Sequence, residues 1–369
     1  MTTNMLGGLM VVELGRSRAA AYAGKVLVDA GAHVLTVGDE ERDRSLPLAA
    51  WLYMDVGKQM LAASPARDRR LLEEILPGAD VVVTDLGPDQ LRSRGLAPEA
   101  VMAACPQTDY LTLSALGWAA ASRPAGELSM QALSGLMHMV GDPEREPLTI
   151  PYGMASVQLG LHAATAVAGR ANDRARHTGQ TGTFIDIAGV EVMASYVRIY
   201  GAVARYYDVP LRRAGRRAPG SGGRYPFALF PCKDGFVAMI ARSEREWTSF
   251  LAMMDNPVWA ESSRYQDLYG IAIHYPDEVD ALVAPWLEAR TRDELLGLAQ
   301  AHAVPMAPVR AIAEVADDVQ LRSRGFFDRI RAPDGTVLDV PGRPWGAGPR
   351  IRTFRPPQFE QAVAALMST

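Results

Sequence analysis

LMVVELGRSRAAAYAGKVLVDAGAHVLTV, residues 9–37, contains two apolar runs separated by a helix-compatible segment. The runs at 9–14 and 32–37 are nearly continuous in apolar residues, which is typical of strands buried on both faces. The segment from about residue 19 to 30 ends at Gly31, and glycine commonly follows the last residue of a helix. Strand, helix and strand in this order predict a βαβ unit with a parallel sheet.

The same alternation continues along the chain. We expect a helix over 67–76, a strand over 79–84, a short helix over 98–104 and a strand over 109–113. Residues 1–115 therefore predict an open α/β sheet of Rossmann type. Further on, the pattern predicts helices over 126–141, 154–171 and 189–204, and a strand over 183–187.

The composition changes near residue 210. Residues 212–224 are basic and rich in glycine, which is typical of a loop or linker. Strands are expected near 227–230 and 236–240, joined by a turn at Lys233-Asp234-Gly235, and helices dominate from 244 to 301. Residues 333–357 are rich in Pro, Gly and Arg and predict an extended tail.

Charge and cysteine content restrict the class of protein. Lys+Arg total 38 and Asp+Glu total 42, so the formal net charge of -4 gives no general electrostatic reason to bind nucleic acid or an anionic membrane. The two cysteines form no C-x-x-C motif, and the first residues have neither a basic nor an apolar leader segment. No apolar run reaches the roughly 18 residues that span a bilayer. We expect a cytoplasmic protein.

The residues offer few recognisable ligand motifs. The first strand-to-helix turn, Gly15 to Ala20, lacks G-x-G-x-x-G, no P-loop occurs, and the six histidines are scattered, so neither a dinucleotide site nor a metal site is expected. Arg16 and Arg18 follow the first strand, where α/β sheets bind ligands, so either they contact a phosphate or carboxylate or they belong to a solvated loop. Gly220, Gly222 and Gly223 form either a flap whose amides approach a ligand or a plain linker.

Seven segments, in the same order, resemble motifs of the class III CoA-transferase family (the formyl-CoA transferase and carnitine-CoA transferase group). They span about 300 residues, and they are Leu6 to Leu14, Leu27 to Val34, Ala79 to Val83, Gln131 to Gly135, His177 to Asp186, Phe230 to Val237 and Val304 to Val309. The resemblance implies a Rossmann-like large domain with an inserted smaller α+β domain. It also implies two subunits that interlock as rings. On this basis we expect a large domain over 1–205, a Gly/Arg-rich linker over 206–225, a small domain over 226–325 and a return segment over 326–369.

The resemblance also implies a reaction. An aspartate carboxylate attacks an acyl-CoA thioester, and acyl and CoA groups then exchange through anhydride and thioester intermediates, which is nucleophilic catalysis by a carboxylate. A CoA thioester is the expected substrate, and no further cofactor is implied. Aligning Gly160 places Ser156 at the aspartate position, and Glu127 falls where transferases of this family carry a glutamate that faces the nucleophile. This chain therefore keeps one member of the pair and lacks the nucleophile.

The CoA-binding segments also depart from the family pattern. Lys58 matches the family's "N-K-x-x" motif, and together with Arg16 and Arg18 it supplies cations. Asp85 and Asp89 fall where the pyrophosphate of CoA approaches, and like charges disfavour binding there. We therefore expect weak binding of CoA.

Three hypotheses remain open at this point. The first is the non-catalytic subunit of a hetero-oligomeric acyl-CoA:carboxylate CoA-transferase, similar to that of succinyl-CoA:benzylsuccinate CoA-transferase, with a homologous catalytic subunit as partner or with itself as a homodimer. The second is a self-sufficient acyl-CoA enzyme that uses Glu127, and the third is a binding or regulatory protein without turnover.

Overall fold

The structure is a computed structural model that describes residues 5–15, 17–38, 47–62, 68, 70–177, 179–208, 211–218, 224–332, 334–345 and 351–353. The chain divides into two compact units, which we describe separately. The first unit comprises Met1–Leu136, Thr149–Val197 and Asp318–Thr369, and the second comprises Met137–Leu148 and Arg198–Asp317.

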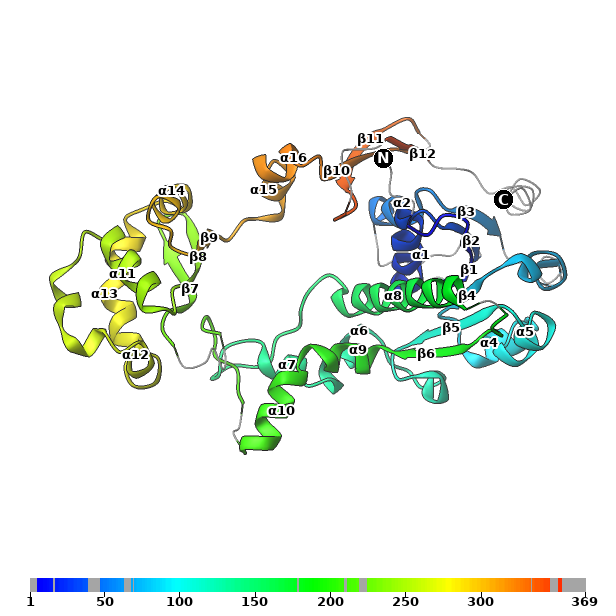
Figure 1. Ribbon diagram of the computed structural model, residues 1–369, viewed down its shortest axis with the longest axis horizontal. Coiled ribbons are helices and arrows are strands. Elements are labelled where there is room, and N and C mark those ends of the chain that lie inside the picture. Colours follow the sequence, from blue (N-terminus) through cyan, green and yellow to red (C-terminus); the bar gives the residue numbers. More distant parts are fainter. Residues whose placement is uncertain are drawn as a thin grey trace. The chain divides into compact units, whose positions relative to one another are not determined.

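A parallel sheet forms the centre of the first unit (Figure 1). Its strands lie in the order β3-β2-β1-β4-β5-β6, and each neighbouring pair is parallel. Their bounds are β1 Met10–Leu14, β2 His33–Gly38, β3 Gln59–Ala62, β4 Val81–Thr84, β5 Asp109–Ser114 and β6 Phe184–Ala188. Strand order reverses at β1, with β2 on one side and β4 on the other, and α/β sheets bind ligands at the carboxyl ends of strands at such a point. The α/β fold and the parallel sheet predicted from residues 9–37 are confirmed.

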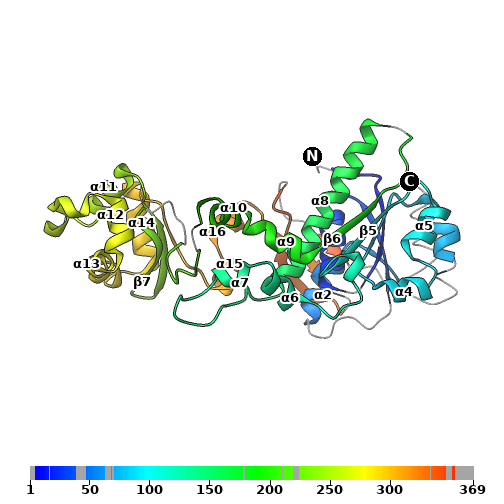
Figure 2. The same ribbon diagram turned by 90° about the horizontal axis from the view of Figure 1, so that it is seen from below.

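Helices cover both faces of this sheet, and Figure 2 shows α8 on one face and α4 and α5 on the other. Helices α1 (Arg18–Ala30) and α8 (Met154–Arg176) share a core with Val11, Val81 and Leu111. Successive side chains of a strand point to opposite faces of the sheet, so the other half of the strand side chains form a second core on the opposite face. The elements that pack there are α4 (Pro88–Ser93), α5 (Pro98–Ala104), a π-helical turn (Leu71–Ile75) and a 3-10 turn (Leu76–Gly78). Helix α2 (Leu48–Asp55) also packs on α1.

Helix α1 illustrates how local sequence fixes an element that supports the site. The hydroxyl of Ser17 accepts hydrogen bonds from the backbone amides of Ala19 and Ala20, which is the usual N-cap arrangement. Gly31 ends the helix in the left-handed conformation at φ 104°, as predicted. Where α1 meets α8, a side chain at Gly160 would collide with the carbonyl oxygen of Ala19, so the two helices approach closely only because this residue is glycine.

Two long helices predicted from sequence are interrupted in the structure. Residues 126–141 form α6 (Glu127–Leu133) and α7 (Leu136–Met139), separated at Gly135, which has φ 84°. Residues 189–204 form α9 (Gly189–Tyr196) and the start of α10 (Arg198–Tyr207), separated at Val197. A 3-10 turn at Trp118–Ala120 precedes α6.

The last part of the first unit, Asp318–Thr369, is more regular than the composition of residues 333–357 predicts. It contains α16 (Val319–Ser323) and a small sheet in the order β11-β10-β12. These strands are β10 Phe327–Arg331, β11 Val337–Pro341 and β12 Ile351–Thr353, with β10 antiparallel to β11 and parallel to β12. Within residues 333–357, the described part includes extended strands, and these pair in a small sheet instead of forming an unpaired tail.

The second unit is a small α+β body with its own aromatic core. Strands β7 (Phe227–Cys232) and β8 (Gly235–Ile240) form the hairpin predicted around Lys233-Asp234-Gly235, and β9 (Met306–Pro308) pairs with β8. Helices α11 (Glu244–Met253), α12 (Leu268–His274), α13 (Pro276–Glu288), α14 (Arg292–His302) and α15 (Ile312–Ala316) complete it, together with 3-10 turns at Val258–Glu261 and Ser263–Tyr265. Its core includes Phe230, Trp247 and Phe250.

Candidate functional site

The first turn of α8 carries the residues that sequence reasoning singled out. Tyr152 and Gly153 precede the helix, and both adopt the left-handed conformation, with φ 62° and 69°. For tyrosine this backbone conformation costs roughly 1 kcal/mol or more, so surrounding contacts must hold it. The chain then enters α8 at Met154, which places Ala155 and Ser156 within the first turn.

Glu127, the first residue of α6, closes this turn through its carboxylate. One oxygen accepts from the backbone amide of Ala155 at 2.8 Å, and the other accepts from the backbone amide of Ser156 at 2.9 Å. The Ser156 hydroxyl donates to the second oxygen at 2.7 Å, and Gln131 Nε2 donates to the first at 2.8 Å. Sequence reasoning predicted that Glu127 faces residue 156, and the structure brings the two together.

These contacts set the charge state of Glu127. Partial burial raises the pKa of the Glu127 carboxyl, but hydrogen bonds from Ser156, Ala155 and Gln131 outweigh this effect, so its pKa lies below its ordinary value. The carboxylate is therefore ionised at neutral pH. Because it already accepts four hydrogen bonds, it is held in place and is weakly basic.

Gln131 begins one of the seven motif segments, and the structure gives it a positioning role. It is buried, and besides its bond to Glu127 it donates to the carbonyl of Ile150 at 3.0 Å and accepts from the Ile150 amide at 2.8 Å. These bonds tie α6 to the segment that leads into α8. The sequence signal that could have identified it is a polar residue among the apolar neighbours of a predicted helix.

Arg18 reaches the same place from the start of α1. Its Nη1 donates to the carbonyl oxygen of Tyr152 at 2.9 Å. A side chain at Gly153 would overlap the guanidinium, so the arginine occupies the space that glycine leaves free. The structure thus brings together Arg18, Glu127 and Ser156 at the amino-terminal turn of α8.

Lys58 lies apart from this group, in a buried ion-pair cluster beneath α1. Its ammonium donates to Glu13 Oε2 and to the carbonyl oxygen of Ala21, both at 2.8 Å, and lies 4.0 Å from Asp55. Burial raises the pKa of Glu13 to about 7, although Lys58 acts in the opposite direction. The Lys58 side chain has no solvent exposure, so direct contact with CoA would require this cluster to open.

Asp85 lies at the carboxyl end of β4 and contacts the start of α1. Its carboxylate accepts from the Ser17 amide at 2.7 Å, and a side chain at Gly15 would meet it. Asp89 is largely exposed and pairs with Arg92 at 3.2 Å. Both acidic side chains therefore have protein partners. The predicted site residues Arg16, Gly220, Gly222 and Gly223 lie outside the described residues.

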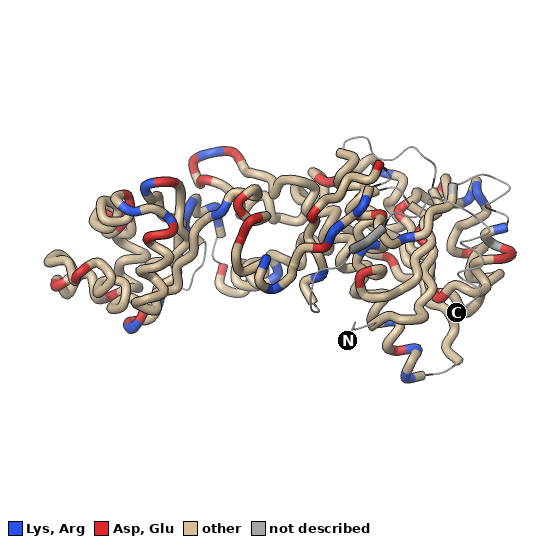
Figure 3. The backbone as a smooth tube through the Cα atoms, turned by 90° about the horizontal axis from the view of Figure 1, so that it is seen from above, with Lys and Arg blue, Asp and Glu red and all other residues tan. Residues whose placement is uncertain are grey.

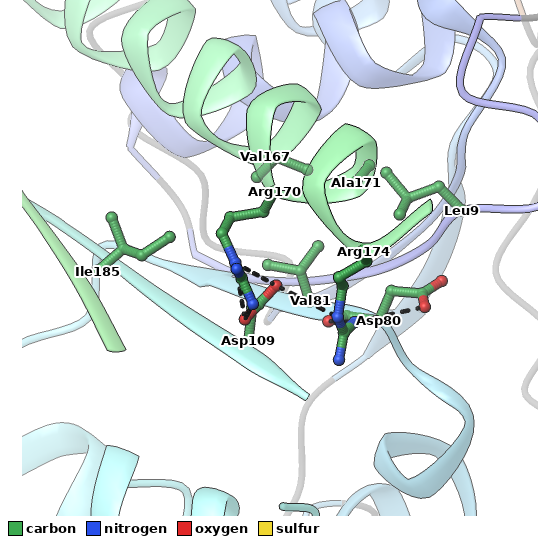
Figure 4. Close-up of a pocket in the computed structure, with 9 residues that line it drawn as sticks. All are labelled: Leu9, Asp80, Val81, Asp109, Val167, Arg170, Ala171, Arg174 and Ile185. Atoms are coloured by element: carbon green, nitrogen blue, oxygen red, sulfur yellow. Dashed lines mark hydrogen bonds and ion pairs between the residues drawn. The ribbon is translucent and has the colours of Figure 1, made fainter. Parts of the chain in front are cut away.

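A hollow at the amino-terminal ends of the strands is lined by ion pairs (Figure 4). It lies where β4 and β5 begin, and Arg170 and Arg174 of α8 point into it. Arg170 pairs with Asp109 at 3.1 Å, and Arg174 lies 3.6 Å from Asp80. Both arginines are paired with acidic residues of the protein itself, so these ion pairs hold α8 against the sheet.

Elsewhere, the described residues show neither a concentration of one charge nor a metal-binding cluster. Acidic and basic residues are interspersed along the chain in each unit (Figure 3). The described part of the chain contains no group of three or more His, Cys, Asp or Glu residues arranged to hold a metal ion. Among its helices, none is both long enough and apolar enough to cross a membrane.

Comparison with known proteins assigns the family. The sequence profile of CoA-transferase family III matches residues 6–361, which is nearly the whole chain. The chain belongs to CoA-transferase family III. It is 25% identical over 353 residues to the succinate–glutarate CoA-transferase of Agrobacterium fabrum, covering 90% of this chain and 87% of that protein.

Two further similarities agree with this family III assignment. The succinyl-CoA:(R)-benzylsuccinate CoA-transferase subunit BbsE of Thauera aromatica is 27% identical over 371 residues, covering 92% of this chain and 86% of that one. The crystal structure of a CaiB/BaiF family protein from Brucella suis superposes with a TM-score of 0.82 at 25% identity, covering 100% of this chain and 99% of that one. This family III chain therefore has the fold of a solved CaiB/BaiF protein.

Proposed function

We propose that this family III chain is the non-catalytic subunit of a hetero-oligomeric acyl-CoA:carboxylate CoA-transferase. The observation that carries the proposal is the pair at α8, in which Ser156 replaces the expected aspartate and donates its hydroxyl to Glu127 at 2.7 Å. The pair retains one carboxylate, and that carboxylate is engaged in four hydrogen bonds.

Serine cannot take over the aspartate's part in the reaction. Attack by a carboxylate on a thioester gives an anhydride, which CoA thiolate or another carboxylate can open readily. Attack by a serine hydroxyl would give an ester, a much weaker acyl donor. The hydroxyl also needs a base to accept its proton, and Glu127 is a poor one because its pKa is lowered.

The same contacts weigh against the hypothesis that Glu127 itself is the nucleophile. To attack a thioester, one oxygen of Glu127 would have to give up hydrogen bonds from Ser156 or from Ala155 and Gln131. These bonds also cap the first turn of α8, so breaking them would expose backbone amides of that turn. The arrangement supports a structural role for Glu127 in this chain.

A homologous partner with an intact aspartate would complete the enzyme. The similar protein BbsE is named as a subunit of its enzyme, which supports a multi-subunit assembly for this chain. Within the proposal, a smaller domain is inserted in the large one and two subunits interlock as rings. The similar succinate–glutarate and succinyl-CoA:(R)-benzylsuccinate enzymes support dicarboxylic acids as the acyl groups and acceptors.

Co-expression with an aspartate-bearing family III protein tests the proposal. The purified chain, the partner alone and the co-purified complex are each incubated with succinyl-CoA and glutarate, and acyl-CoA products are quantified by chromatography. We expect transfer by the complex and none by this chain alone. A covalent CoA thioester on this chain, released by hydroxylamine, would refute the proposal.

A further inference from the structure

Arg18 is a partly buried cation at the candidate site, and it has no acidic partner among the residues that the structure describes. Its one hydrogen bond within the described residues goes from Nη1 to the Tyr152 carbonyl oxygen, at 2.9 Å. None of the ion pairs formed among those residues includes Arg18. The Nε–H group is buried and has no hydrogen-bond partner in the described part of the chain. A buried donor without a hydrogen-bond partner is unfavourable, so an acceptor supplied by a ligand at this point would stabilise the site.

The local backbone holds this guanidinium in place. Arg18 begins α1, whose start is fixed by the Ser17 hydroxyl and by the bond from the Ser17 amide to Asp85. On the opposite side the guanidinium lies over Gly153, where any side chain would overlap it. Arg18 is thus the first residue of a helix and its guanidinium is hydrogen-bonded to Tyr152, so it does not lie in a solvated loop.

Within the described residues, the acidic group of the site does not pair with Arg18. Glu127 directs its carboxylate to the Ala155 and Ser156 amides and to the Ser156 hydroxyl. Residue 156, where the family resemblance places an aspartate, is neutral in this chain. A cation therefore remains beside a site from which one negative charge is missing.

We propose that Arg18 is a specificity-determining residue that binds the carboxylate of an organic acid, either a free acid or the second carboxylate of a dicarboxylic acyl group. The guanidinium has N–H groups left after its bond to Tyr152, and these suit a planar carboxylate. The negative charge of Glu127, which is hydrogen-bonded to the first turn of α8, disfavours a phosphate dianion more than a singly charged carboxylate. The inference rests on the proposed function for the identity of the ligand, but binding itself needs no turnover.

Calorimetry on the full chain tests the proposal by measuring the affinity for glutarate. The diamide of glutaric acid, which has the same carbon chain without the charges, is the control ligand. We expect glutarate to bind, the diamide not to bind, and Arg18→Gln to weaken glutarate binding at least about tenfold. Arg18→Lys should retain part of the affinity because it keeps the charge but loses the fork geometry. The matched control is Arg176→Gln, at the exposed far end of α8, about 30 Å along the helix from Ser156, which should leave affinity unchanged.

A second variant guards against loss of fold. Gly153→Ala keeps the arginine but displaces its guanidinium, so it should also weaken glutarate binding; thermal unfolding of each variant verifies that it is folded. Equal affinity of wild type and Arg18→Gln, binding of the diamide as strong as that of glutarate, or tighter binding of inorganic phosphate than of glutarate would each overturn the proposal. The transfer assay of the co-purified complex is a separate measurement, so failure of the subunit proposal and failure of carboxylate binding are distinguishable.

Discussion

The hydroxyl of Ser156 and the carboxylate of Glu127 are joined by a 2.7 Å hydrogen bond, and the amide of Ser156 donates to the same carboxylate oxygen at 2.9 Å. Both donors of residue 156 therefore serve to hold the glutamate. An aspartate at this position would face Glu127 with a second negative charge instead of a donor. The replacement converts what the family resemblance implies to be a reactive pair into a neutral donor and a satisfied acceptor.

Ser156→Asp should restore reactivity to this chain. Two carboxylates at this separation cannot both ionise freely, so the pKa of one of them should rise well above its ordinary range. We expect a covalent adduct with succinyl-CoA that hydroxylamine releases, detected by mass spectrometry. Ser156→Asn, which has the same shape without the charge, is the control, and adduct formation by neither variant would contradict the placement of the nucleophile at residue 156.

Glu127→Gln should destabilise the first unit by about 1–2 kcal/mol, because an ionised acceptor at the start of α8 is replaced by a neutral one. The effect should depend on pH. Since the pKa of Glu127 is lowered in the folded protein, its contribution is present above the pKa of the unfolded chain and is lost as pH falls through the folded pKa. Unfolding curves of both proteins at neutral and acidic pH should therefore converge at the acidic end; a constant difference would argue against an ionised Glu127.

Glu13 should give the opposite pH dependence. Its folded pKa is raised to about 7 from 4.5, so the folded protein retains a proton that the unfolded chain has already released. Stability from this group is full below about pH 4.5 and falls as pH rises to about 7, by on the order of 1.4 kcal/mol per unit of the pKa difference. Glu13→Gln should flatten this part of the stability profile measured by urea unfolding. A wild-type profile that rises with pH across the same window, unaltered by Glu13→Gln, would rule this out.

Asp280 should be the most sensitive polar residue of the second unit. This buried carboxylate accepts hydrogen bonds from Arg216, Arg217 and Tyr225. Removing its charge leaves two arginines without their buried counter-ion and weakens the hydrogen bond from Tyr225. Asp280→Asn should therefore lower the free energy of unfolding by about 2–4 kcal/mol. The neighbouring Asp277 is 88% exposed and also pairs with Arg217, so Asp277→Asn should cost under about 1 kcal/mol. Thermal unfolding of both variants measures the difference, and similar losses would show that burial of Asp280 is unimportant.

The isolated chain should bind CoA more weakly than roughly micromolar. Lys58 is committed to Glu13 and Ala21, and the acidic side chains of Asp85 and Asp89 lie at the carboxyl end of β4 and the start of α4. Calorimetry with CoA tests this, and Asp89→Asn should increase affinity by removing an exposed charge. Micromolar or tighter binding by the wild-type chain would instead favour a self-sufficient acyl-CoA enzyme.

Several features of this protein followed from sequence because they depend on local or periodic patterns. The continuous apolar runs around Val11 and Val34 indicated buried parallel strands, and Gly31 marked the end of α1 through its left-handed conformation. Motif order led to the family, and it also led to Ser156 and Glu127 as partners. Breaks such as the one at Gly135 were missed because helix periodicity continues through a residue whose positive φ ends the helix.

Only the tertiary structure decided what the charged residues do. Arg18 and Lys58 both appeared as candidate ligands of CoA, yet one reaches the turn before α8 and the other is buried under α1 against Glu13. Gln131, which orients Glu127 through Ile150, had no assigned role until its partners were known. Sequence records the local preferences that form each strand and helix. The partner of a charged side chain depends on which elements pack together across tens of residues, and burial then determines whether that charge holds the fold together or remains available to a ligand.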